Sequence, residues 1–162
     1  MNQILFFYYQ KFPFVFEYFN FLRDLFLVIQ FILVLIFIIH SRNWKNIFYY
    51  FLIFFFAFLL TYFLKNIFPS LRPDGSSYDS FPSRHITISF ALSLALIWQN
   101  LKLGILSLTL TFLIAILSFL SLRHWPIDIL FGFIFGFLVF FIIYKISHFF
   151  YWFDLKTRQN KT

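Results

Sequence analysis

Seven ionisable side chains that could carry out phosphoryl transfer lie in two short stretches of this sequence. They are three cations and a histidine, followed about forty residues later by a cation, a histidine and a carboxylate: Lys65, Arg72, Arg84, His85, Arg123, His124 and Asp128. Lysine and arginine neutralise phosphate oxygens, one histidine can attack or accept a proton, and the other can protonate the leaving oxygen. An aspartate can hold an imidazole in the required tautomer. This set of groups predicts phosphoryl transfer from side chains alone.

Metal and cofactor chemistry has little support in the composition. The chain has no cysteine, and its 4 histidines and 6 acidic residues are scattered. A disulfide and a thiolate metal site are excluded, and too few carboxylates lie near the two histidines for a two-metal site. We predict no metal and no cofactor.

The composition places these residues in a membrane protein. Hydrophobic residues make up 62% of the 162 residues, aromatic residues 27% and charged residues only 12%. An ordinary soluble domain is nearer half apolar and a quarter charged. The net charge is +7. Its cations are therefore expected to bind anionic lipid or a phosphate-bearing substrate, or to lie on the cytoplasmic side, and not to bind nucleic acid.

Apolar runs of sufficient length predict an all-α fold, a single domain over 1–162 with about five transmembrane helices. The predicted spans are 25–39, 47–64, 86–98, 103–122 and 127–146. Residues 1–22, which mix charges with aromatics, are expected to form an interfacial helix. Residues 148–162 are expected to form a basic tail outside the membrane.

The polar loop over 65–85 and the break over 123–126 are expected on the same face, because two predicted spans separate them. Once the cations assigned to the site are set aside, positive charge is concentrated on the opposite face, with the tail. The positive-inside rule then puts the tail in the cytoplasm and the site on the outer, periplasmic face of a bacterial cytoplasmic membrane.

Three ordered motifs resemble those of the type-2 phosphatidic acid phosphatase superfamily. They are Lys65-x6-Arg72-Pro73, Phe81-Pro82-Ser83-Arg84-His85 and His124-Trp125-Pro126-Ile127-Asp128. The superfamily patterns are Lys-x6-Arg-Pro, Pro-Ser-Gly-His and Ser-Arg-x5-His-x3-Asp. Three motifs at the family spacings form a strong signal, whereas one alone is weak.

The resemblance implies a role for each matched residue. His124 would be the nucleophile that forms a phosphohistidine, and Asp128 would orient it. His85 would protonate the leaving oxygen, while Lys65, Arg72 and Ser83 would bind the phosphate.

The second and third motifs each depart from the family pattern at one position. Arg84 replaces the usual glycine, and Ser118 stands where the third motif has an arginine, six residues before His124. Arg84 or Arg123 could supply the missing cation, or phosphate binding could be weaker. The sequence alone leaves these alternatives open.

Several of these residues also have purely structural interpretations. Lys65 and Arg123 could be anchors at span ends, and Asp128 could cap the helix that follows Pro126. Arg84 could form a surface ion pair with Asp74 or Asp79. Two glycines spaced as Gly-x3-Gly, at positions 132 and 136, could mark a close helix contact within the chain or between chains.

The string from Ser80 to His85 is most similar to small bacterial undecaprenyl-diphosphatases, which implies removal of the terminal phosphate from undecaprenyl diphosphate. Phosphatidylglycerophosphate, phosphatidic acid and lipid A phosphate are alternative substrates of the same class. A different class is a non-catalytic lipid-binding relative that lost activity with the arginine at position 118. A channel or transporter is disfavoured, because the second, third and fifth predicted spans carry almost no polar groups at mid-depth.

Overall fold

Five helices form an antiparallel bundle in the computed structural model, which describes residue 7 and residues 10–159, with side chains through residue 149. The helices are α2 (Pro13–Ser41), α3 (Trp44–Ile67), α4 (Arg84–Gln99), α5 (Leu101–Leu120) and α6 (Pro126–Gln159). Four of them, α2, α3, α5 and the part of α6 from Pro126 to Phe149, are long and apolar enough to cross a membrane. The all-α prediction of a polytopic bundle is confirmed.

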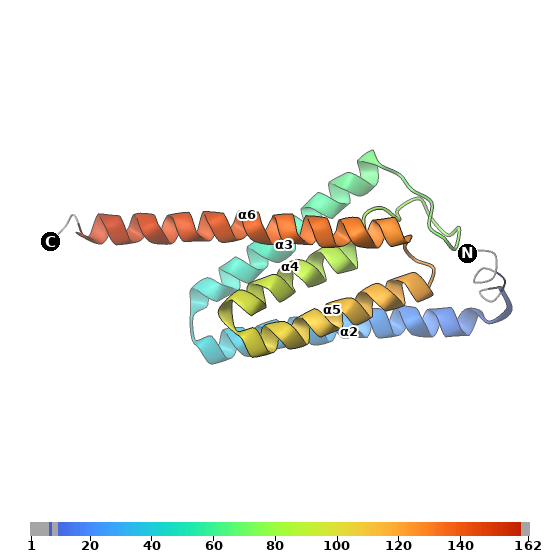
Figure 1. Cartoon of the computed structure of the whole chain (residues 1–162), viewed down its shortest axis with the longest axis horizontal. Coiled ribbons are helices and arrows are strands. Elements are labelled where there is room, and N and C mark those ends of the chain that lie inside the picture. The colour runs from blue at the N-terminus through green and yellow to red at the C-terminus, as the bar shows by residue number, and fades with distance from the viewer. Residues whose placement is uncertain (1–6, 8–9, 160–162) are drawn as a thin grey trace.

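Helix α4 is the short central element of this bundle. It has 16 residues, which at about 1.5 Å per residue is shorter than the roughly 30 Å hydrocarbon core. It contacts α2, α3, α5 and α6, and Figure 1 shows it between the other helices. Its first turn carries His85, so the helix that all others surround positions one of the two candidate catalytic histidines.

Helix α2 differs from the predicted division between an interfacial segment and a first span. It runs without a break from Pro13 to Ser41, so residues 13–22 continue directly into the span. Residues 1–6, 8 and 9 of the predicted interfacial segment lie outside the described residues. Glutamate and arginine suit a helix interior well, and proline suits its first turn. The charges at Glu17, Arg23 and Asp24 therefore limited the predicted span without ending the helix.

Helix α6 likewise passes through residue 148, where the tail was expected to begin, and ends at Gln159. Residues 160–162 lie outside the described part of the chain.

Polar side chains tie α2 to its neighbours in the middle of the bundle. Gln30 Nε2, which carries two N–H donors, lies 2.7 Å from Ser89 O, 2.9 Å from Ser93 Oγ and 2.7 Å from Ser107 Oγ. All four residues are fully buried. The third predicted span therefore does carry polar groups at mid-depth, contrary to the expectation, and their hydrogen bonds are used to join α2, α4 and α5.

The two glycines in α6 mark an internal contact with α4. A Cβ atom on Gly132 would lie 3.0 Å from Ile86 Cβ, and one on Gly136 would lie 2.8 Å from Thr87 O. The contact is within the chain. It sets the distance between α6, which follows His124, and α4, which carries His85.

Candidate active site

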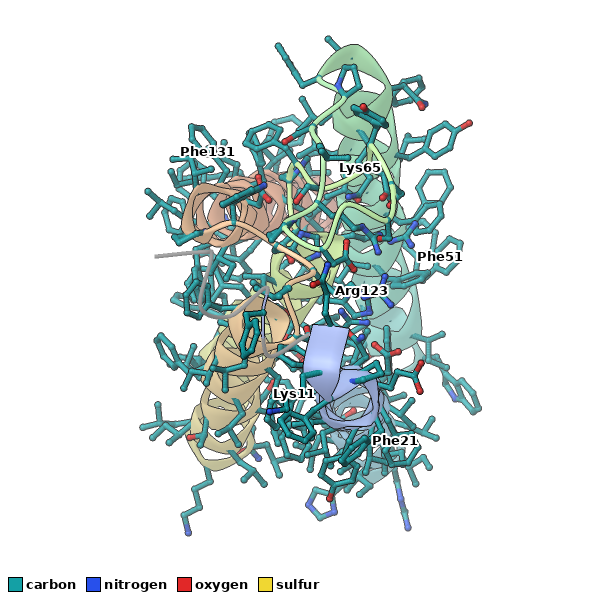
Figure 2. The ribbon with its side chains drawn as sticks, turned by 90° about the vertical axis from the view of Figure 1, so that its right-hand side faces the viewer. Lys11, Phe21, Phe51, Lys65, Arg123 and Phe131 are labelled. Atoms are coloured by element: carbon teal, nitrogen blue, oxygen red, sulfur yellow. The ribbon has the colours of Figure 1, made fainter. Side chains whose placement is uncertain are left out.

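One polar cavity of about 220 Å³ opens where the loop over 68–83 meets the turn over 121–125 and the first part of α2. Its lining residues come from four parts of the chain: Arg23, Lys65, Arg72, Asp79, Arg84, His85, Arg123 and His124. Figure 2 looks onto this end of the bundle, with Lys65 and Arg123 near the centre and Phe51 and Phe131 toward the rim. Six of the predicted site residues thus meet in one place, and both polar segments lie at the same end of the bundle, as predicted (Figure 1).

The loop that follows α3 folds back on itself and presents Arg72. Gly75 N donates to Arg72 O at 2.9 Å, and Gly75 has a φ of 74°, a conformation that glycine adopts at little cost. Arg72 Nη2 then bonds Asp79 Oδ2 at 2.8 Å, and Lys65 Nζ donates to Asp79 O. Asp79 therefore holds both cations of the first motif at the cavity.

The carboxylate of Asp79 stays ionised in this position. Burial by itself would raise its pKa, but the hydrogen bond from Ser77 and the charge of Arg72 outweigh burial and hold the pKa of Asp79 below its usual value. Asp79 was one of two acids that could have paired with Arg84, and the structure pairs it with Arg72 instead.

The ring of His124 is fixed by a backbone carbonyl. Its Nδ1 lies 2.8 Å from Ser80 O, and a carbonyl can only accept, so Nδ1 carries the proton. The lone pair is then on Nε2. Burial, with the positive charges of Lys65 and other cations of the site, lowers the pKa of His124 well below its usual value. The side chain is therefore a neutral imidazole with one nucleophilic nitrogen.

Asp128 lies near Nδ1 of this histidine, and it also caps α6. Asp128 Oδ2 lies 3.9 Å from His124 Nδ1, accepts from Trp125 N at 2.8 Å and accepts from Ser80 Oγ. Direct orientation of the ring by Asp128 was expected, but Ser80 O accepts the hydrogen bond from the ring N–H, and Asp128 Oδ2 is beyond hydrogen-bond distance. The fully buried carboxylate is placed to stabilise a positive charge on the imidazole.

Ser83 lies apart from the cavity lining. It is the N-cap of α4, its backbone N–H donates to Asp128 O at 3.1 Å, and its Oγ is buried without a hydrogen-bond partner among the described residues. Ser83 therefore joins the start of α4 to the start of α6. Its contact with phosphate stays a prediction.

His85 has a carboxylate partner that sequence reasoning missed. Its Nε2 lies 3.1 Å from Asp24 Oδ1, and Arg23 Nη2 bonds the same oxygen at 2.8 Å. Arg23 is buried in the cavity wall. Two adjacent charges at the edge of an apolar run were the only sequence signal, and such residues are more often interfacial anchors.

The other two arginines of the cavity have partners at its edges. The Arg84 guanidinium lies 5.1 Å from the ring centroid of Phe58 on α3, a cation–π distance. Arg123 Nη1 lies 3.5 Å from Asp74 Oδ2. Neither acid of the loop pairs with Arg84, contrary to the expectation.

An apolar groove lies next to the polar cavity. It has a volume of about 720 Å³, and apolar side chains from α3, the loop and α6 provide most of its lining, among them Leu64, Phe68, Phe81, Phe131 and Phe135. Asp128 is its charged member, while the neighbouring His124 lines the cavity. The two openings therefore meet at the third motif.

Within the part of the chain that the structure describes, no group of three or more histidine, cysteine, aspartate or glutamate side chains converges to hold a metal ion.

Comparisons with known proteins agree with this architecture. A crystal structure of a transmembrane PAP2-type phosphatidylglycerolphosphate phosphatase from Bacillus subtilis is similar, with a TM-score of 0.63 and 23% identity over 84% of this chain and 78% of that chain. At this identity the likeness establishes the fold. No curated protein sequence matches the chain. A family model described as PAP2 superfamily matches residues 46–152, which include all three motifs, and the chain therefore belongs to the PAP2 superfamily.

Proposed function

We propose that this protein is a membrane lipid phosphatase that releases phosphate through a phosphohistidine on His124. The observation that carries the proposal is the hydrogen bond from His124 Nδ1 to Ser80 O. It leaves a neutral Nε2 as the nucleophile beside a cavity lined by five cations and one carboxylate, Asp79. A neutral imidazole next to concentrated positive charge is the arrangement that attack on a phosphate requires.

The reaction proceeds in two steps. In the first, Nε2 of His124 forms a bond to phosphorus, the bond from phosphorus to the lipid oxygen breaks, and His85 gives its proton to that oxygen. In the second, a water oxygen bonds to phosphorus, the bond from phosphorus to Nε2 of His124 breaks, His85 takes a proton from the water, and inorganic phosphate leaves. Lys65 and Arg72 offset the charge of the equatorial oxygens in both steps, and Asp128 stabilises the positive imidazole.

The adjacent apolar groove supports a lipid substrate. A headgroup in the cavity would leave its hydrocarbon chain beside Phe81 and Phe131, both of which line the groove. The substrate would then approach from within the bilayer, with its tail still in an apolar environment.

Undecaprenyl diphosphate is the substrate we propose, with undecaprenyl phosphate as the product. A phosphate monoester carries about −1.5 to −2 charges at neutral pH, and the excess of cations over carboxylates in the cavity lining favours a more highly charged diphosphate. Phosphatidylglycerophosphate, phosphatidic acid and lipid A phosphate remain the alternatives. The site would face the periplasm across a bacterial cytoplasmic membrane, because the positive charges outside the site are concentrated at the opposite end.

Phosphate release by the purified protein in detergent tests this proposal. Undecaprenyl diphosphate, phosphatidylglycerophosphate, phosphatidic acid and lipid A phosphate are compared in the presence of a chelator, with His124→Ala as the negative control. We expect release that persists with chelator, is fastest with undecaprenyl diphosphate and is lost in His124→Ala. Absence of release from every lipid by a folded, monodisperse protein would instead identify a non-catalytic relative.

A further inference from the structure

The serine at position 118 brings no charge to the cavity of this protein. Ser118 is fully buried on α5, and its Oγ donates to Ile114 O at 2.7 Å, within the same helix. Its backbone carbonyl accepts from both Arg123 N and His124 N at 3.3 Å. The residue at the motif position therefore supports, through its backbone carbonyl, the turn that carries His124.

Helix α2 supplies a guanidinium to the cavity. Arg23 lines the cavity together with both candidate catalytic histidines, and only 8% of the residue is exposed. Its positive charge is one of the causes, after burial and the charges of Lys65 and His85, that lower the pKa of His124. Helix α2 packs along α5, the helix of Ser118 (Figure 1). The cation thus comes from the direct neighbour of the helix on which the motif arginine is missing.

The burial of Arg23 calls for an anion beyond its present partner. Within the described part of the chain, its hydrogen bonds from Nε at 2.9 Å and from Nη2 at 2.8 Å go to a single oxygen, Asp24 Oδ1. His85 shares this oxygen, and the Asp24 side chain is 57% exposed. A guanidinium has five N–H donors in a planar fork that matches phosphate oxygens. A buried cation within a membrane helix is costly unless it is paired or functional.

The two alternative cations are less suited to this role. Arg84 lies over the ring of Phe58 on α3. Arg123 is held by Asp74 in the outer loop, with 30% of its side chain exposed. Arg23 is more deeply buried than Arg123, with 10% of its side chain exposed. It also lies outside residues 46–152, the part that the family model matches.

We propose that Arg23 on α2 binds the non-bridging phosphate oxygens of the substrate in place of the arginine that the third motif lacks at position 118. This role rests on the proposed phosphatase function, but phosphate binding can be measured without turnover. Arg23 is thereby a substrate-binding residue contributed by a helix outside the motifs.

A relocation experiment tests the proposal. Kinetics with undecaprenyl diphosphate are measured for wild type, Arg23→Ala, Ser118→Arg and the double variant. We expect Arg23→Ala to lower kcat/KM by about 10²–10³-fold, the usual loss when one charge-stabilising donor is removed. We expect the double variant to recover at least tenfold of that loss, because Ser118→Arg returns a guanidinium to the motif position.

Binding of inorganic phosphate gives a readout that does not depend on turnover. The measurement uses detergent-solubilised His124→Ala protein, which cannot be phosphorylated at position 124. Isothermal titration calorimetry should show at least tenfold weaker phosphate binding when Arg23→Ala is added to this variant. Arg42→Ala, at the opposite end of α2, is the matched control and should leave binding unchanged. If wild type turns over no lipid, the proposed function fails, and this titration still decides the role of Arg23.

Asp24→Asn separates phosphate binding from a purely structural role. If Arg23 only holds Asp24 against His85, Asp24→Asn will weaken phosphate binding as much as Arg23→Ala does. We expect Asp24→Asn to bind phosphate at least as tightly as the unsubstituted protein, because a negative charge near the anion has been removed. Phosphate binding that is equal in Arg23→Ala and its parent, with both proteins folded by circular dichroism, would overturn the proposal.

Discussion

Replacing Asp128 by asparagine tests whether its charge drives the first chemical step. In the proposed mechanism, the imidazole of His124 becomes positively charged when its Nε2 bonds to phosphorus. Asp128 Oδ2 lies 3.9 Å from Nδ1 of that ring. Two unit charges at about 4 Å interact by about 4 kcal/mol at an effective dielectric constant of about 20, which corresponds to roughly 10³-fold in rate. Since only part of the charge has formed in the transition state, we expect Asp128→Asn to lower kcat by about 10²–10³-fold.

The asparagine is a near-isosteric replacement that isolates the charge. Its side-chain oxygen can still accept from Trp125 N, which Asp128 now caps at 2.8 Å, so the start of α6 should be retained. The cavity cations are unchanged, and KM should therefore move little. Single-turnover rates and KM are measured with undecaprenyl diphosphate, and folding is checked by size-exclusion chromatography and circular dichroism.

Ser80→Ala is the matched control for this experiment. It removes the hydroxyl that donates to Asp128 Oδ2 but keeps both the carboxylate and the backbone carbonyl that accepts from His124 Nδ1. We expect a loss in kcat of about tenfold or less. A kcat of Asp128→Asn within threefold of wild type would refute the electrostatic role, and an equal loss in both variants would assign the effect to the hydroxyl link.

Three further predictions follow from burial and packing. Burial and nearby cations lower the pKa of His124, so the imidazole stays neutral to lower pH and the acid limb of kcat/KM should lie below pH 6.5. Lys65→Met removes one of these cations, and a pH–rate profile should therefore show the acid limb moved to higher pH. Gly136→Ala would put a methyl group 2.8 Å from Thr87 O and should destabilise the protein by about 1–3 kcal/mol, measured by thermal unfolding in detergent, and unchanged unfolding would contradict the close contact. Gln30→Leu removes a buried amide whose Nε2 lies 2.7–2.9 Å from three acceptors and whose Oε1 accepts from Ser89 Oγ. It should cost about 1–3 kcal/mol while the folded fraction stays active, and an unaltered melting temperature would contradict this.

Features set by spacing along the chain could be predicted from the sequence. Two apolar spans between the polar segments were enough to bring Lys65, His85 and His124 to one end of the bundle, and they line one cavity. The spacing of Asp128 from His124 allowed either a helix cap or a partner for the ring. The structure gives Asp128 a cap bond and a 3.9 Å separation from the ring.

Features set by tertiary contacts could not be predicted. A backbone carbonyl has no sequence signature, so the hydrogen bond from His124 to Ser80 O was hidden. The pairing of Arg23 and Asp24 with the site depends on how α2 docks against α4 and α5, and charges at the edge of an apolar run are usually anchors. The charges also led to a wrong predicted start for α2. They limit which residues can face lipid, but they do not limit the length of a helix.

The proposed phosphate contact of Arg23 predicts that phosphate binding stabilises the docking of α2. Gln30 fixes the middle of α2 to α4 and α5 through buried hydrogen bonds, and Arg23 lies about two turns away on the same helix, since seven residues at 3.6 per turn separate them. A ligand that binds only the docked state stabilises it in proportion to the logarithm of its concentration relative to Kd. Phosphate should therefore raise the melting temperature of Gln30→Leu, which keeps the guanidinium, and should fail to do so when Arg23→Ala is added. On this proposal, the hydrogen bonds of Gln30 and the phosphate contact of Arg23 both stabilise the docked position of α2 against α4 and α5.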